Sequence, residues 1–301
     1  MTQVLVLGAH GMLGSMVARA LAQDPALQVT ATGRNDDAPA PPGCEYRTFD
    51  ASADPLGPVL DGGDYEWIMN AIGVIKPRID ERQAASIENA IAINALFPYR
   101  LAAESAHRGQ RVIQIATDCV YSGSTGAYRE PAPHDPVDVY GKSKSLGEVP
   151  ADSMIHLRCS IIGPELGRSS SLLGWILSAA PGAQLNGFTD HFWNGVTTLH
   201  FAKLCAAVIA GTEVPARQHI VPGDSVSKAQ LLEQVLSAYG RTDVTVNPGP
   251  APQPIDRTLA SDDPDSSRRL WSAAGYDQPP TIAQMLDELA AYEAEYMSEA
   301  A

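Results

Sequence analysis

The sequence has little of what a metal centre or a disulfide-stapled fold requires. Its four cysteines form no Cys-x-x-Cys pair, and its seven histidines include no His-Glu-x-x-His motif. Zinc sites and disulfide frameworks depend on such spacings, so we expect neither, and we expect no other metal site. The cysteines stand singly along the chain, as Cys44, Cys119, Cys159 and Cys205.

Long apolar runs and an excess of basic charge are also missing. The N-terminus enters a short strand-like run at once, without the basic and apolar segments of a signal peptide, so we expect a cytoplasmic protein with no membrane partner. The chain has 21 basic and 35 acidic residues, which gives a formal net charge of −14 and argues against nucleic acid as a partner. A phosphorylated ligand stays compatible, because backbone N–H groups and single Arg or Lys side chains bind phosphate locally.

What the chain does contain begins with a glycine-rich turn near its N-terminus. Val4 to Leu7 has the pattern of a strand buried on both faces, and Ser15 to Gln23 has that of a helix. Between them Gly8 to Gly14 reads Gly-Ala-His-Gly-Met-Leu-Gly. Glycines allow close backbone approach, and a helix N-terminus offers free N–H groups and a positive dipole end. The order of strand, glycine turn and helix therefore predicts a site for a dinucleotide pyrophosphate.

The residues that follow the second expected strand, Gln28 to Thr32, indicate whether the cofactor is NAD(H) or NADP(H). An acidic residue there would bind both ribose hydroxyls and favour NAD, whereas Arg34 can pair with a 2′-phosphate. Arg34 therefore favours NADP(H), and NAD(H) stays the alternative because Asn35-Asp36-Asp37 follows. A third strand, Tyr46 to Phe49, leads into Asp50, whose carboxylate could accept from the adenine amino group.

Two further strands end in residues that could contact a cofactor or a substrate. Trp67 to Gly73 contains the fourth strand and runs into a turn of small residues that leaves room for a cofactor ribose. Arg111 to Thr117 is the fifth strand and ends on a hydroxyl. Between them Arg82 to Arg108 has the pattern of one long helix, in which Asn94 either bonds the backbone of a neighbouring element or holds a water of a proton relay.

A helix expected from Val139 to Glu148 places Tyr140 and Lys144 one turn apart on the same face. A phenol beside an ammonium loses its proton more easily. With the Thr117 hydroxyl, the three groups could surround a carbonyl and protonate it. This arrangement suits carbonyl reduction, provided that a cofactor supplies the hydride.

Strands that alternate with helices predict an α/β fold, a Rossmann-like doubly wound parallel sheet whose ligands bind at the carboxyl ends of the strands. Gly8, Gly73 and Thr117 fall at such ends, so we expect them to converge. After a sixth strand the alternation is lost, and we expect a Rossmann domain over 1–165, to which 188–212 returns. A smaller C-terminal α/β substrate lobe would comprise 166–187 and 213–301. Later expected elements are helices at 169–180, 197–210, 227–239, 266–274 and 281–296, strands at 154–162, 215–221 and 244–246, and an irregular aromatic segment at 184–196.

Taken together, these residues resemble the extended short-chain dehydrogenase/reductase superfamily and, within it, the dTDP-4-dehydrorhamnose reductase family. The resemblance covers residues 1 to about 210, and the C-terminal third matches only in outline. The matching pieces are Gly8 to Gly14, Asn70 to Gly73, Ala116-Thr117-Asp118, Val139 to Lys144, Leu157 to Ser160 and Gly195 to Thr198.

The resemblance implies a reductase that converts a 4-keto group of a nucleotide-linked deoxysugar into an alcohol, as in rhamnose and polysaccharide biosynthesis. By the family's pattern Tyr140 is the general acid and Lys144 binds the nicotinamide ribose. Thr117 would hydrogen-bond the reacting oxygen, and Asp118 would lie close to the sugar. A homodimer is left open. The remaining cofactor contacts would be Gly11, Met12 and Leu13 at the pyrophosphate, Asp50 and Ala51 at the adenine, and Ala71, Ile72 and Gly73 at the ribose, with Gly8 and Gly14 shaping the turn.

Two alternatives remain. The first is an epimerase or dehydratase of nucleotide sugars, although dehydratases of the superfamily usually carry an acidic pair where this chain has Asp118 followed by Cys119. The second is a non-catalytic regulatory subunit like that of methionine adenosyltransferase. The presence of both Tyr140 and Lys144 favours an enzyme over this alternative. Ile161 stands where many family members carry an aromatic residue, which leaves the identity of the sugar open, and Arg257 is a weaker diphosphate candidate.

Overall fold

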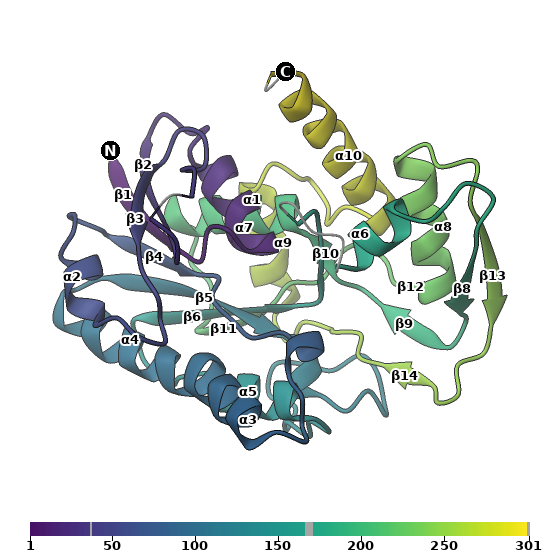
Figure 1. Ribbon diagram of the computed structural model, residues 1–301, viewed down its shortest axis with the longest axis horizontal. Helices are drawn as coiled ribbons and strands as arrows, with labels where there is room; N and C mark the ends of the chain where they lie inside the picture. Colours follow the sequence, from purple (N-terminus) through teal and green to yellow (C-terminus); the bar gives the residue numbers. More distant parts are fainter. Residues whose placement is uncertain (37, 166–170, 300–301) are drawn as a thin grey trace.

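The computed structural model describes residues 1–36, 38–165 and 171–299. Within them, seven strands form one sheet in the order β11-β6-β5-β4-β1-β2-β3, and each neighbouring pair is parallel (Figure 1). The predicted Rossmann-like fold is therefore confirmed. The strands are β1 (Thr2–Leu7), β2 (Leu27–Gly33), β3 (Glu45–Thr48), β4 (Trp67–Asn70), β5 (Arg111–Thr117), β6 (Met154–Cys159) and β11 (Arg217–His219).

Helices cover both faces of this sheet, because its central strands are apolar on both faces. In β1, Val4 and Val6 belong to the core that includes α1 and α7, whereas Leu5 and Leu7 join the core under α2 and α4. This alternation is the period of two that a strand imposes, and it makes the sheet the middle of three layers. The helices are α1 (Met12–Leu21), α2 (Leu56–Leu60), α4 (Phe97–His107) and α7 (Thr198–Ile209).

The long helix expected from Arg82 to Arg108 is present but contains one π-helical turn, η2 (Ala92–Leu96), between α3 (Ala84–Ile91) and α4. The helix α5 (Val139–Leu146) packs against this turn. Asn94 in the turn donates to the Ser143 hydroxyl of α5 at 3.1 Å. Just beyond α5, a Cβ at Gly147 would overlap the Asn94 carbonyl oxygen. The helix with Tyr140 and Lys144 is thus held close to the π-helical turn.

The later part of the chain adds a smaller group of elements beside the sheet (Figure 1). They include a three-stranded sheet in the order β12-β9-β14 and a pair of strands, β13 and β8. Another short pair, β7 and β10, lies next to them in the sequence. The elements are β7 (Ile161–Ile162), α6 (Leu172–Leu177), β8 (Gln184–Phe188), β9 (His191–Trp193), β10 (Val196–Thr197), β12 (Val226–Ser227), α8 (Lys228–Ala238), β13 (Thr245–Gly249), β14 (Ile255–Asp256), α9 (Pro264–Ala273) and α10 (Ile282–Glu299).

Two expectations for this part need correction. The segment 184–196 is not irregular, because it contains β8, β9 and β10, which pair with strands far away in the sequence. Such pairing leaves little local pattern in short strands. In addition, β11 lies inside the segment 213–301 that we assigned to the smaller lobe, yet it pairs with β6 as an edge strand of the large sheet. The expected start of the helix at 169 lies outside the described residues.

None of the helices in the described ranges combines the length and the apolar character that crossing a membrane requires.

Candidate active site

The glycine turn joins β1 to α1. Gly8 has a φ of +85°, a left-handed backbone conformation that residues with a Cβ rarely adopt. Gly14 lies so near to Gly8 that a Cβ would overlap the Gly8 carbonyl oxygen. Gly11 is the N-cap of α1 and has no side chain with which to cap it. The first-turn N–H groups of Met12 and Leu13 therefore have no partner within the helix and suit an anionic ligand.

At the end of β2, Arg34 is exposed. Hydrogen bonds from Ser52 chiefly lower the pKa of Asp50, and the charge of Arg34 lowers it further. One oxygen of Asp50 accepts from the N–H and the hydroxyl of Ser52 at 2.9 and 2.6 Å. Arg34 and Asp50 therefore lie close enough for the charge of Arg34 to act on the Asp50 carboxyl.

Beyond β4, two buried asparagines hold the turn Ala71-Ile72-Gly73. Asn70 accepts from the Ile72 N–H at 3.1 Å. Asn94 accepts from the Val74 N–H at 2.8 Å and donates to the Val74 carbonyl at 2.9 Å. These bonds show the structural alternative for Asn94, in which the side chain bonds the backbone of a neighbouring element.

Thr117, Tyr140 and Lys144 come together at the carboxyl end of β5. Burial raises the pKa of the Tyr140 phenol well above its usual value, although a hydrogen bond with Thr117 lowers it. The Lys144 ammonium, buried at 7% exposure, donates to the Ile115 carbonyl at 2.8 Å. Burial lowers the pKa of Lys144 to about 8.

The expectation that Lys144 lowers the pKa of Tyr140 is wrong for this arrangement. Burial dominates at Tyr140, and the Lys144 ammonium is engaged with the backbone of β5. A phenol with a raised pKa keeps its proton at neutral pH. Tyr140 is therefore set up to donate a proton rather than to exist as a phenolate.

The start of α5 explains how Tyr140 reaches Thr117. Asp138 is the N-cap, and its carboxylate accepts from the Gly141 N–H at 2.8 Å. A salt bridge of 2.8 Å joins Asp138 to Lys76. A Cβ at position 141 would overlap the Cys119 carbonyl oxygen, so the glycine lets the helix approach the loop that follows β5. The residue beside Tyr140 thus has to be small.

Two cations from the later part of the chain face Asp118. Burial raises the pKa of this carboxyl, and the charges of Arg257 and Lys228 act against that rise. Arg257 also donates through Nε to the Tyr121 carbonyl at 2.8 Å. Sequence reasoning treated Arg257 only as a weak candidate and missed Lys228, because no motif surrounds Lys228 and its neighbours at the site are remote in sequence.

Next to α5 lies a buried ionic cluster. Arg158, 1% exposed, donates through Nε to Glu148 at 2.9 Å and through Nη1 to the Tyr121 hydroxyl at 2.6 Å. Burial raises the pKa of Glu148, but the bonds from Arg158 outweigh it and keep the carboxyl ionised. Burial also lowers the pKa of His219 to about 4, so a neutral imidazole lies 2.6 Å from the Arg158 guanidinium.

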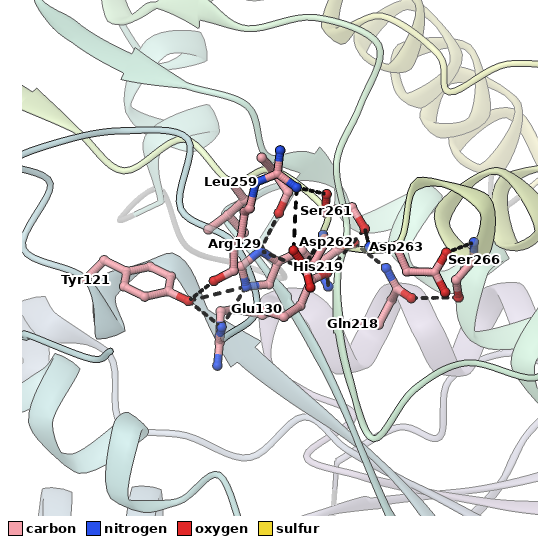
Figure 2. A network of polar contacts seen from close by, with 12 residues as sticks. Tyr121, Arg129, Glu130, Gln218, His219, Leu259, Ser261, Asp262, Asp263 and Ser266 are labelled. Atoms are coloured by element: carbon pink, nitrogen blue, oxygen red, sulfur yellow. Dashed lines mark hydrogen bonds and ion pairs between the residues drawn. The ribbon is translucent and has the colours of Figure 1, made fainter. Parts of the chain in front are cut away.

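The same network fastens the segment before α9 to the large sheet (Figure 2). Glu130 accepts from the backbone N–H groups of His219 at 2.9 Å and of Asp262 at 2.6 Å. Gln218 accepts from the Ser266 hydroxyl at 2.9 Å. Side chains of β11 and of the loop after β5 therefore fix the chain that follows Arg257.

Among the residues with described positions, no group of three or more His, Cys, Asp or Glu side chains is arranged to hold a metal ion.

Three known proteins show sequence similarity to the chain. The spore coat polysaccharide biosynthesis protein SpsK of Bacillus subtilis is 30% identical over 158 residues, 49% of this chain and 47% of that protein. The probable low-salt glycan biosynthesis reductase Agl14 of Haloferax volcanii is 29% identical over 235 residues, 73% of this chain and 76% of that protein. Methionine adenosyltransferase 2 subunit beta of Xenopus tropicalis is 29% identical over 147 residues, 48% of this chain and 41% of that protein. The match thus spans about half the length of SpsK.

Two solved structures share the fold. The dTDP-4-dehydrorhamnose reductase of Bacillus anthracis, in complex with NADP, superimposes with a TM-score of 0.72 at 18% identity, over 97% of this chain and 100% of that one. The UDP-glucuronic acid 4-epimerase of Bacillus cereus, in complex with NAD, gives 0.71 at 18% identity, over 97% of this chain and 96% of that one.

The sheet order, the glycine turn and the Thr, Tyr and Lys side chains define a Rossmann-fold protein of the extended short-chain dehydrogenase/reductase superfamily. The chain also matches the family described as the RmlD substrate binding domain over residues 1–262, and it belongs to that family. The resemblance seen in the sequence is confirmed. The prediction of an NAD(P)-dependent enzyme agrees with the named relatives and the solved structures.

Proposed function

We propose that this protein reduces a 4-keto group on a nucleotide-linked deoxysugar with NADPH. The observation that carries the proposal is the convergence of Thr117, Tyr140 and Lys144 at the same sheet edge as the glycine turn. A dTDP-4-dehydrorhamnose reductase among the solved structures has the same fold, and a named glycan biosynthesis reductase is among the relatives.

The residues at the cofactor end fit a dinucleotide. The turn from Gly8 to Gly14 has no room for a Cβ at either glycine and presents first-turn N–H groups. Arg34 would hold the 2′-phosphate, which favours NADP(H) over NAD(H). The adenine would lie against Asp50 and Ala51. The ribose next to the nicotinamide would lie against the turn 71–73 and Lys144.

In the proposed reaction a nicotinamide held by the glycine turn, the turn 71–73 and Lys144 would supply the hydride that the carbonyl carbon takes up. Tyr140 donates its phenolic proton to the carbonyl oxygen, and its raised pKa keeps that proton available at neutral pH. Thr117 hydrogen-bonds the same oxygen and orients the phenol. Lys144 holds the cofactor ribose in place of the Ile115 carbonyl or together with it. Asp118 contacts the sugar.

We also propose that the two parts of the chain divide the ligands. The part up to about residue 165 would bind the cofactor, and the elements α6, α8, β13 and β14 would bind the sugar nucleotide. Arg257 and Lys228, which come from this later part, already face Asp118 across the strand ends. A homodimer remains a prediction.

The proposal is tested by NADPH consumption with a panel of dTDP-, UDP- and GDP-linked 4-keto sugars. We expect turnover with at least one of them and stoichiometric release of NADP⁺, which an epimerase would not give. Absence of turnover with the whole panel, with NADPH still bound, would instead support a regulatory role, for which the similarity to methionine adenosyltransferase 2 subunit beta is the supporting observation.

The variant Tyr140→Phe tests the proposed role of the Tyr140 hydroxyl as the proton donor. It removes only the hydroxyl, so we expect kcat to fall by about 100- to 10,000-fold while the Kd of NADPH stays within about twofold. Stopped-flow absorbance at the nicotinamide band gives kcat, and fluorescence titration gives the Kd. Turnover at the wild-type rate would remove Tyr140 from the proposed mechanism.

A further inference from the structure

The start of helix α8 holds Lys228 in a well-defined position. It is the first residue of α8, directly after the N-cap Ser227, whose hydroxyl accepts from the Gln230 N–H while the Gln230 side chain accepts from the Ser227 N–H. This capping box fixes the first turn of the helix. The preceding strand β12 pairs with β9, in the register that sets Val226 opposite Trp193. As a result the Lys228 ammonium lies 5.6 Å from the centre of the Trp193 ring.

The stability of α8 does not explain a lysine at this position. A positive charge in the first turn opposes the helix dipole, which favours acidic residues there. The side chain is partly buried, and burial lowers the pKa of Lys228, against which the charge of Asp118 acts. In the part of the chain that the structure describes, Lys228 forms no ion pair within 4.0 Å. The ammonium is therefore near Asp118 without touching it.

Asp118 links this ammonium to the reacting atoms. Its carboxylate accepts from the Thr117 hydroxyl at 3.1 Å, and Thr117 in turn is hydrogen-bonded with Tyr140. A ligand carbonyl held by Thr117 and Tyr140 would therefore have Asp118 and Lys228 beside it, on the side of the later elements. The groups nearest to that carbonyl are the substituents of the neighbouring carbon atoms.

We propose that Lys228 and Asp118 together bind one hydroxyl of the sugar, on the carbon next to the reacting carbonyl. Lys228 donates to the oxygen of this hydroxyl, and Asp118 accepts its proton. A hydroxyl offers one donor and acceptor lone pairs, so an ammonium and a carboxylate with a gap between them satisfy it from both sides. This inference rests on the proposed reduction of a 4-keto sugar.

The assignment narrows the substrate class. In a 6-deoxy-4-keto hexose, the carbon on one side of the carbonyl carries the ring oxygen and the methyl group. The hydroxyl next to the carbonyl is therefore the one on carbon 3. The protein should select 4-keto sugars that keep this hydroxyl and should reject 3-deoxy analogues, because their binding would leave the Lys228 ammonium and the Asp118 carboxylate without this partner.

The test compares wild type with Lys228→Met on two substrates, dTDP-4-dehydrorhamnose and its 3-deoxy analogue. For the hydroxylated sugar we expect kcat/KM to fall by about 10- to 100-fold in the variant, mostly through KM, because a bond from a charged donor is lost. For the 3-deoxy sugar we expect a change below about threefold. The Kd of NADPH should stay the same in both proteins. Lys203→Met is the matched control, since Lys203 pairs with Glu288 on α7 and α10, away from the strand ends.

Asp118→Asn serves as a second variant if Lys228→Met does not fold, and we expect the same selective loss on the hydroxylated sugar. Equal losses on both substrates would indicate a structural role for Lys228 and overturn the inference, as would unaltered kcat/KM on the hydroxylated sugar. If wild type reduces neither substrate, nor any other member of the 4-keto panel, the proposed function itself fails. The two failures are thus separated by the wild-type result.

Discussion

The two ends of the site are built by different means. At the end proposed to bind the cofactor, hereafter the cofactor end, the site is formed mainly by the backbone: Gly8, Gly14 and the first turn of α1 form a tight loop at the end of one continuous sheet. At the end proposed to bind the sugar, hereafter the sugar end, charged side chains from distant segments lie near one another, as Lys228 and Arg257 do with Asp118. The first end tolerates few changes of shape, whereas the second depends on the packing that brings separate segments together.

The large sheet stabilises the cofactor end, whereas side-chain networks outside the sheet hold the sugar end. A parallel sheet with helices on both faces holds its strand ends in place whatever lies beyond them. The sugar end has no such frame and relies on the buried cluster of Arg158, Glu148 and His219 and on the network around Glu130 (Figure 2). Changes at the two ends should therefore have different consequences.

The largest effect is expected from breaking the buried cluster. Arg158→Met removes the buried cation of Glu148 and leaves this buried carboxylate with only the half-exposed Arg217, 3.7 Å away, so it should lower the free energy of unfolding by about 3–5 kcal/mol. Arg108→Met is the matched control, because its partners Asp61 and Glu104 are exposed and ion pairs at the surface contribute little to stability. Urea unfolding measures both. A loss below that of the control would mean that the cluster does not hold the sugar end.

A smaller effect, at the opposite end, is expected for Gly14→Val. Its side chain would collide with the Gly8 backbone, and overpacking of this kind costs about 1–3 kcal/mol, so the Kd of NADPH should rise by roughly 5- to 150-fold. Gly249→Ala is the control, because nothing lies within 4 Å of a Cβ there. Fluorescence titration of NADPH distinguishes them. Equal affinities in the two variants would contradict a backbone-built cofactor end.

The pH dependence of stability tests the residue between the two ends. Burial lowers the pKa of Lys144 to about 8, whereas the unfolded chain holds this proton up to about pH 10.4. Between these values the unfolded state binds more protons, so this residue makes the protein more stable as pH rises. Relative to Lys144→Met, wild type should gain on the order of 2 kcal/mol from about pH 7 to about pH 10. Urea unfolding without cofactor at both pH values checks this, and a constant difference would contradict it.

The smallest effect concerns Arg34, the side chain proposed to bind the 2′-phosphate of the cofactor. Arg34→Ala should weaken NADPH binding by about tenfold through loss of a contact to the 2′-phosphate, and should leave NADH binding unchanged. The control is Arg268→Ala, an exposed residue that pairs with Asp265 on α9. Equal weakening of both cofactors would assign Arg34 to the adenosine in general rather than to the phosphate.

The large sheet and the cofactor end could be predicted from the sequence for a physical reason. The central strands β1, β4, β5 and β6 are compact, mainly apolar runs, and the turn at Gly8 to Gly14 is a local arrangement whose parts are neighbours in the chain. Tyr140 and Lys144 are one helical turn apart, so their shared face follows from helix geometry alone. The expected direction of the Tyr140 pKa shift was wrong, because burial is a tertiary property that spacing does not show.

The sugar end was decided by tertiary structure. The strands β8, β9 and β10 were expected as an irregular segment, and β11 was expected outside the large sheet, because short strands are stabilised by partners that lie far away in sequence. For the same reason Lys228 carries no signal of its own beside Ser227. The sequence by itself determined the fold class, the glycine turn and the helix that carries Tyr140 and Lys144. Only the folded chain decided which cations stand opposite Asp118, because that requires β12 to pair with β9 and the cluster of Arg158 to close behind them.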